Sequence, residues 1–168
     1  MKYYAGIGSR ETPVHICLMM ANIARKLEKL GYILRSGGAQ GADQAFASGC
    51  TDKEIYVPWH DFQGLPMIFP IPQEAYDIAS KIHPGWDHLK PAAKTMMARN
   101  TMQIQGADLR NNSHFVICWT PDGATCTKER RRTTGGTGQA IDLASRLGVG
   151  VFNLAKEEHL QRLKEFTK

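Results

Sequence analysis

Three glycine-rich turns, each following an apolar run and preceding a stretch with helical character, constrain the fold of this chain more than any other feature. The turns lie at residues 6–10, 37–43 and 133–138. Strands that alternate with helices at this spacing are typical of βαβ units and therefore of a mainly parallel sheet. Right-handed crossovers place the turns that follow parallel strands along one edge of the sheet, where ligands bind. The pattern predicts a ligand site built from these turns.

The third turn gives the strongest indication of an anion site. Residues 133–139 combine threonines, glycines and a glutamine, and a helix is expected directly after them, at residues 140–147. The amino end of a helix presents unpaired backbone N–H groups and the positive end of the helix dipole, and phosphate is its usual occupant. Glycine lets a backbone approach a ligand closely. The alternative for Gly135 and Gly136 is a tight turn without a ligand.

We expect a Rossmann-like α/β fold with three αβα layers, a mainly parallel sheet of five or more strands and one domain over residues 1–168. In the first helix, Thr12 is expected to cap the amino end, Pro13 to take the first helical position and Gly31 to close the helix. Pro91 should lie in the first turn of a later helix. Apolar periodicity predicts further strands and helices. The expected strands are residues 2–7, 32–36, 53–58, 115–119 and 150–154, and the further helices are residues 42–49, 74–81, 87–106, 140–147 and 157–166.

Two segments do not fit the alternation. Residues 59–72 contain several prolines, so we expect an irregular segment that lies over the site or at a subunit contact. Residues 120–132 are polar and end in a basic run, so we expect a mobile loop there.

Composition places the chain among ordinary globular proteins, with 42% hydrophobic and 22% charged residues. Its first residues do not form a signal peptide, and no stretch is apolar enough to span a membrane. We therefore expect a cytoplasmic protein, in the host cytoplasm if the chain is viral. The formal net charge of +5 suits a ligand that carries phosphates.

Several nucleotide and metal motifs are absent. The dinucleotide-binding pattern begins with Gly6 and Gly8, but Glu11 occupies the position of its third glycine. No glycine-rich turn continues into the Lys and Ser or Thr of a P-loop, and no cysteine or histidine spacing is typical of zinc. We expect neither a metal nor a cofactor.

Four short segments together resemble the SLOG superfamily of Rossmann-like domains, and this resemblance covers nearly the whole chain. It is carried by residues 6–10, 36–43, 98–100 and 135–138. That superfamily includes the DNA-processing protein A domain, the LOG phosphoribohydrolases and ligand-sensing domains of nucleotide-signal immunity. The chain is most similar in form to small stand-alone members from phage and bacterial genomes. The resemblance implies a homodimer or a higher homo-oligomer.

The resemblance also implies catalytic residues if the chain is an enzyme, namely Arg99 and Asp142. In LOG enzymes an Arg and a Glu serve hydrolysis of the N-glycosidic bond of a nucleoside monophosphate. Arg99 matches that Arg, whereas Gln139 replaces a Thr and Asp142 replaces the Glu. An Asp carboxylate falls short of a Glu carboxylate by roughly 1.5 Å, and a misplacement of that order can cost ~100-fold in rate. The change favours binding over catalysis.

The predicted ligand-binding residues come from the three turns and from the Arg-Asn pair. They are Gly8, Ser9, Arg10, Ser36, Gly37, Gly38, Gln40, Gly41, Asp43, Arg99, Asn100, Thr134, Gly135, Gly136, Thr137, Gly138 and Gln139.

Several of these and other polar residues have a structural alternative. Asp43 either accepts hydrogen bonds from a ribose diol or orients the neighbouring turn, or it only stabilises the dipole of its helix. The arginines of residues 130–132 either screen phosphates or bind a nucleic-acid backbone, or they belong to a solvated loop. His83 and Trp86 either roof the site or pack in the core.

Three functions follow. The first is binding of a phosphate-bearing, nucleotide-derived small molecule, such as one of ADP-ribose type, for sensing or sequestration. The second is hydrolysis of a nucleoside monophosphate by a LOG-like phosphoribohydrolase. The third is binding of single-stranded DNA in the manner of DNA-processing protein A.

Overall fold

A five-stranded, entirely parallel sheet forms the centre of the computed structural model, which describes residues 1–168. The strand order is β3-β2-β1-β4-β5. The expected fold class, a Rossmann-like α/β fold, is therefore confirmed. The strands are β1 (Lys2–Gly6), β2 (Tyr32–Ser36), β3 (Lys53–Ile55), β4 (Phe115–Cys118) and β5 (Gly150–Asn153).

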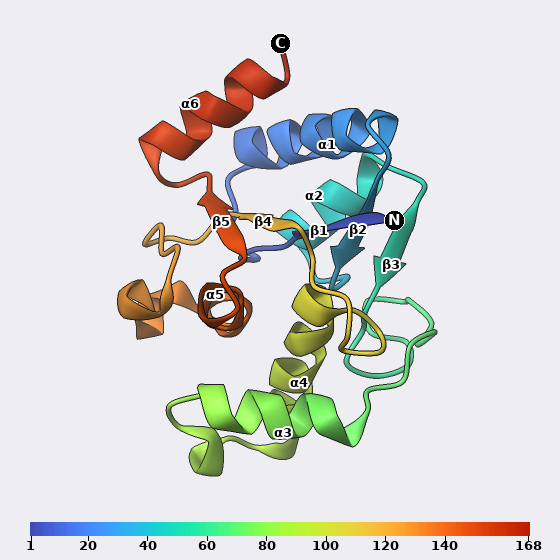
Figure 1. Ribbon diagram of the computed structural model, residues 1–168, viewed down its shortest axis with the longest axis vertical. Coiled ribbons are helices and arrows are strands. Elements are labelled where there is room, and N and C mark those ends of the chain that lie inside the picture. The colour runs from blue at the N-terminus through green and yellow to red at the C-terminus, as the bar shows by residue number, and fades with distance from the viewer.

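Helices cover both faces of the sheet (Figure 1). On one face lie α1 (Val14–Lys29), α2 (Ala42–Ser48) and α6 (Glu157–Phe166). On the other lie α4 (Pro91–Gln105) and α5 (Thr137–Arg146), and α3 (Gln73–Ile82) packs on these two helices, farther from the sheet.

The two layers bury separate apolar clusters because a parallel sheet is covered on both faces. Met20 and Ile23 of α1 pack with Phe46 of α2 against one face. Ile104 of α4 and Ile141 of α5 pack against the other. The elements that carry the turns are thus held from both sides of the sheet.

Two helix starts differ from expectation. Thr12 does not cap α1, because its Oγ1 donates to the carbonyl of Ser9 at 2.6 Å. The expected helix at residues 87–106 is divided: a 3-10 turn, η1 (Trp86–His88), precedes α4, and Lys90 between them is extended. Pro91 explains the break, because a proline disfavours helical conformation in the residue before it.

The two irregular segments acquire local structure. Residues 59–72 contain one isolated bridge, between Phe62 and Leu65. The segment expected to be a mobile loop contains η2 (Thr127–Glu129) and runs into a further 3-10 turn, η3 (Arg132–Thr134). Glu129 accepts hydrogen bonds from the Thr125 N–H and from Lys156 Nζ, both at 2.9 Å, which tie this segment to the chain after β5.

The chain order defines where a ligand can enter. From β1 the chain moves outward through β2 to β3 and then returns to β4 on the other side of β1. In open parallel sheets, ligands bind outside the carboxyl ends of the strands at such a reversal. None of the helices has the length and apolar character needed to cross a membrane.

Candidate functional site

A cavity of about 470 Å³ lies at this reversal, beyond the carboxyl ends of the strands. The turn after β1 contributes Gly8, the turn after β2 contributes Ala39, the first turn of α2 contributes Asp43, and the turn before α5 contributes Gly135. This volume is in the range of sites for small organic ligands. Segments distant in sequence thus meet at one edge, as the strand pattern predicts.

The structure brings many of the predicted residues to this cavity. Those that line it are Gly8, Ser9, Arg10, Asp43, Arg99, Asn100, Thr134, Gly135, Gly136 and Thr137.

The other predicted residues do not line the cavity. Ser36 is buried, and its Oγ donates to the carbonyl of Gly6 at 2.5 Å. Gln139 turns toward α3, where its Nε2 donates to the carbonyl of Ala79 at 3.1 Å. Both side chains serve packing between elements. The remaining residues outside the lining are Gly37, Gly38, Gln40, Gly41, Gly138 and Asp142.

Arg99 is buried and holds two backbone segments in place. One of its terminal nitrogens donates to the carbonyl of Gly37 at 2.5 Å and to that of Tyr56 at 2.9 Å. Its Nε donates to Asn100 Oδ1 at 2.9 Å. Burial lowers the pKa of the guanidinium, while Asp43 acts in the opposite direction. Arg99 therefore fixes the turn after β2 and also places a cation at the cavity.

Asp43 is a buried carboxylate with an unused hydrogen-bonding capacity. Its Oδ2 accepts from the N–H of Ala39 at 3.3 Å, whereas its Oδ1 has no partner. Burial raises its pKa to about 6, although Arg99 opposes the shift. A buried acceptor without a partner is costly, so a ligand hydroxyl or amino group would satisfy it.

The turn before α5 is held by residues outside it. Thr134 Oγ1 donates to Asp122 Oδ2 at 2.6 Å, and Asn100 Nδ2 donates to the carbonyl of Gly136 at 3.1 Å. The N–H of Gly136 has no acceptor within the protein. Gly135 has a φ of +74°, which favours glycine. Since the Thr134 hydroxyl already donates to Asp122, the free donors of this turn are backbone groups and the hydroxyl of Thr137, which also lines the cavity.

Asp142 differs from the role that the family resemblance implies. Its carboxylate accepts from Thr127 Oγ1 at 2.7 Å, from Arg146 Nε at 2.8 Å and from a terminal nitrogen of Arg130 at 3.1 Å. Burial alone would raise its pKa, but these hydrogen bonds hold it below its usual value. Asp142 therefore positions basic side chains outside the cavity.

Sequence reasoning missed the aromatic and methionine lining of the cavity. Trp59 and Phe62 come from the irregular segment, and Met96 and Met97 come from α4. The proline-rich composition indicated a segment over the site but not which side chains face it. His83 and Trp86 do not line this cavity; they lie beside the turn after α3.

Of three comparisons with known proteins, only the comparison of structures found a match. No family model matches the chain, and no curated protein matches it. The structure is similar to that of DNA processing protein A from Helicobacter pylori, which was described for the way in which that protein binds single-stranded DNA. The TM-score is 0.62 at 17% sequence identity, and the match covers 99% of this chain and 78% of that chain. This likeness shows a common Rossmann-type fold.

Proposed function

We propose that this protein binds a phosphate-bearing, nucleotide-derived small molecule in the cavity at the carboxyl edge of its sheet. The observation that carries the proposal is that two residues lining the cavity each have a group without a hydrogen-bond partner: Gly136 has a free donor, its N–H, and Asp43 has a free acceptor, its Oδ1. The first suits a phosphate oxygen and the second a ribose hydroxyl. Trp59 supplies an aromatic face for a base.

The charge of the lining also favours an anion. Arg10 is exposed at the cavity and forms no salt bridge with any carboxylate. Its guanidinium is free to bind a phosphate in the two-pronged manner typical of arginine. Arg99 adds a second, buried cation.

Titration calorimetry with the four nucleoside 5′-monophosphates and with ADP-ribose tests this proposal. Binding of at least one of them to the wild type is expected, and Arg10→Ala should weaken it about tenfold, as loss of a hydrogen bond to a charged group does. Arg25→Ala, which removes an exposed arginine from α1, is the matched control. Equal affinities in the wild type and in Arg10→Ala would contradict the role of Arg10, and no binding at all would contradict the proposal.

Binding of single-stranded DNA is a second candidate, favoured by the likeness to a protein studied for that activity. A labelled oligonucleotide whose affinity falls steeply with salt, and exceeds that of every mononucleotide, would support this candidate. Release of free base from a bound nucleotide would instead indicate a hydrolase. Because Asp142 is bound to two arginines outside the cavity, the carboxylate implied for that chemistry does not line the site.

A further inference from the structure

A second hollow, of about 700 Å³, lies on the other side of the turn before α5. Gly135, Gly136 and Met97 line both this hollow and the first cavity. The two spaces therefore share a wall made largely of glycine backbone.

Gly136 is a glycine that the fold itself does not require. Its φ and ψ of −61° and −30° are ordinary helical values. A Cβ built there would meet only the terminal methyl group of Met97, at 3.8 Å. A Cβ would therefore fit in the protein without a ligand. Because Gly136 has no side chain, the two spaces are connected over its backbone.

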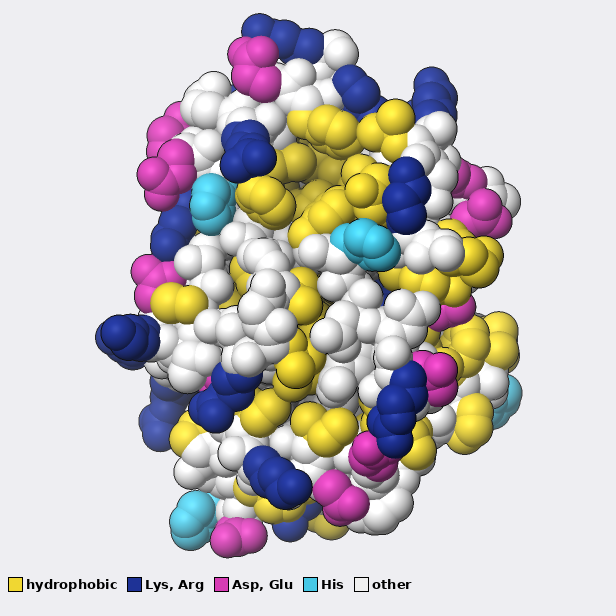
Figure 2. Space-filling view, viewed as in Figure 1, with side chains coloured by type: hydrophobic (Ala, Val, Ile, Leu, Met, Phe, Trp, Pro, Cys, Tyr) yellow, Lys and Arg dark blue, Asp and Glu magenta, His cyan; other side chains and the backbone are white.

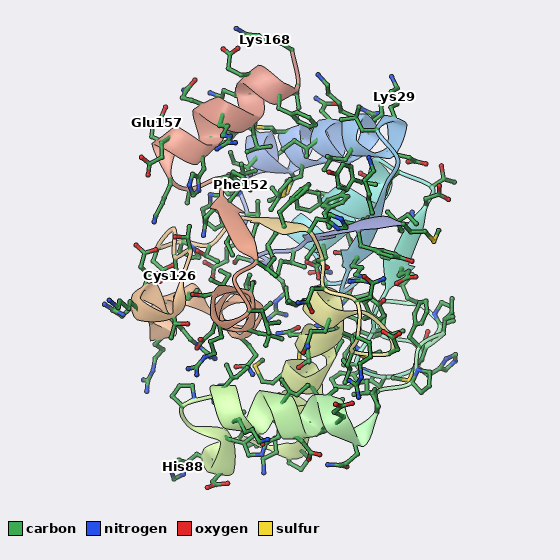
Figure 3. The ribbon with its side chains drawn as sticks, viewed as in Figure 1. Lys29, His88, Cys126, Phe152, Glu157 and Lys168 are labelled. Carbon is green, nitrogen blue, oxygen red and sulfur yellow. The ribbon has the colours of Figure 1, made fainter.

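The second hollow is strongly basic. Arg130, Arg131, Arg132 and Arg146 line it, against the single carboxylate of Asp142. Arg131 and Arg132 form no salt bridge. Figure 2 shows Lys and Arg side chains spread over the face seen in Figure 1, and Figure 3 shows the segment that starts at Cys126 lying against α5.

Asp142 gives this basic cluster a defined geometry. One carboxylate oxygen accepts from Arg130 and the other from Arg146, and the Arg130 side chain is only 12% exposed. The nearby Glu129 is bound to Lys156 and does not neutralise the arginines. The cluster thus has cations in excess and one of them is held rigidly, which is the arrangement that binds phosphate.

We infer that the second hollow is a subsite for a further phosphate of the same ligand, so that the ligand is a nucleotide chain with two separate phosphates. One phosphate lies at the N–H of Gly136 in the first cavity, and the chain crosses over Gly136 to place the next phosphate among Arg130, Arg131 and Arg132. This inference rests on the proposed function, because it extends the same site.

The test compares mononucleotides with dinucleotides by titration calorimetry. For each nucleoside 5′-monophosphate that binds the wild type, the 5′-phosphorylated dinucleotide of the same base is expected to bind at least about tenfold more tightly, as gain of a hydrogen bond to a charged group allows. The double variant Arg131→Ala/Arg132→Ala should lose that advantage and keep its mononucleotide affinity within about twofold. The matched control, Arg25→Ala/Lys29→Ala, removes two exposed basic residues of α1 and should keep the advantage.

The outcomes separate the two proposals. The second subsite is wrong if mononucleotides bind but dinucleotides bind no more tightly, or if the double variant still binds dinucleotides more tightly than mononucleotides. The proposal for the first cavity is retained in both cases. If neither probe binds, the proposed function fails and the subsite fails with it. A ten-nucleotide single strand identifies the source of the two phosphates. If it binds with the same affinity as the dinucleotide, the ligand is a small molecule; if it binds more tightly and this extra affinity falls with salt, the ligand is a nucleic-acid strand.

Discussion

Asn100 and Gly136 are joined by a hydrogen bond of 3.1 Å from the side-chain amide to the backbone carbonyl, which ties α4 to the turn before α5. The same side chain accepts from Arg99 Nε through its Oδ1. One amide therefore connects the buried cation of the cavity with Gly136, which also lines the cavity.

Asn100→Ala should loosen this connection. Loss of both hydrogen bonds is expected to lower the free energy of unfolding by about 1–2 kcal/mol and to weaken nucleotide binding as well. Chemical denaturation and titration calorimetry measure the two effects. Asn112→Ala, at an exposed position before β4, is the control and should change neither; an Asn100→Ala variant that behaves like this control would refute the connection.

Gly136→Val should abolish ligand binding while the fold persists. The backbone conformation of Gly136 suits any residue, and there is room for a Cβ, so the fold should tolerate a side chain that fills the space proposed for the ligand. A circular dichroism spectrum and a melting temperature near those of the wild type, together with loss of calorimetric binding, are expected. Unchanged affinity would place the ligand elsewhere.

Asp43→Asn should change how stability depends on pH. The folded-state pKa of about 6 lies above the usual 3.8, so this group favours folding fully below pH 3.8 and loses that contribution as pH rises through 6. Between pH 4 and pH 7, the unfolding free energy of Asp43→Asn should therefore rise by about 2 kcal/mol relative to that of the wild type. Urea denaturation of both proteins at the two pH values measures this difference, and a difference independent of pH would contradict the assigned burial.

Asp142→Asn should destabilise the protein by about 2 kcal/mol, because it leaves partly buried arginines without their counter-charge. Glu165→Gln is the matched control, since Glu165 pairs with Lys168 in an exposed bridge, and such bridges contribute little. Thermal denaturation of both variants makes the comparison. Equal, small effects would show that the network around Asp142 contributes nothing to folding.

Trp59→Ala should weaken nucleotide binding about tenfold if the indole stacks on a base, given the usual contribution of one such stack. Trp59 is 41% exposed, so the fold should tolerate the change. Trp59→Phe keeps an aromatic face and should retain most of the affinity. Calorimetry on both variants provides the measurement, and equal affinities in the alanine and phenylalanine variants would argue against stacking.

The amino-acid sequence by itself determined the αβ alternation, the parallel sheet and the position of the glycine-rich turns. These follow from apolar periodicity and from turn residues, which act locally along the chain. The start of α4 shows the limit of local reasoning: Pro91 lies in the first turn of the helix, as predicted, but the helix begins at Pro91 rather than at residue 87, after an extended Lys90.

Only the tertiary structure decided which polar side chains reach the cavity. Asp142 and Gln139 lie on the same helix as the predicted anion site, yet arginines outside the cavity bind the first and a carbonyl of α3 binds the second. Trp59 enters the site from a segment without regular structure. These placements depend on contacts between segments far apart in the chain, and no local pattern encodes the partner that a side chain meets after folding.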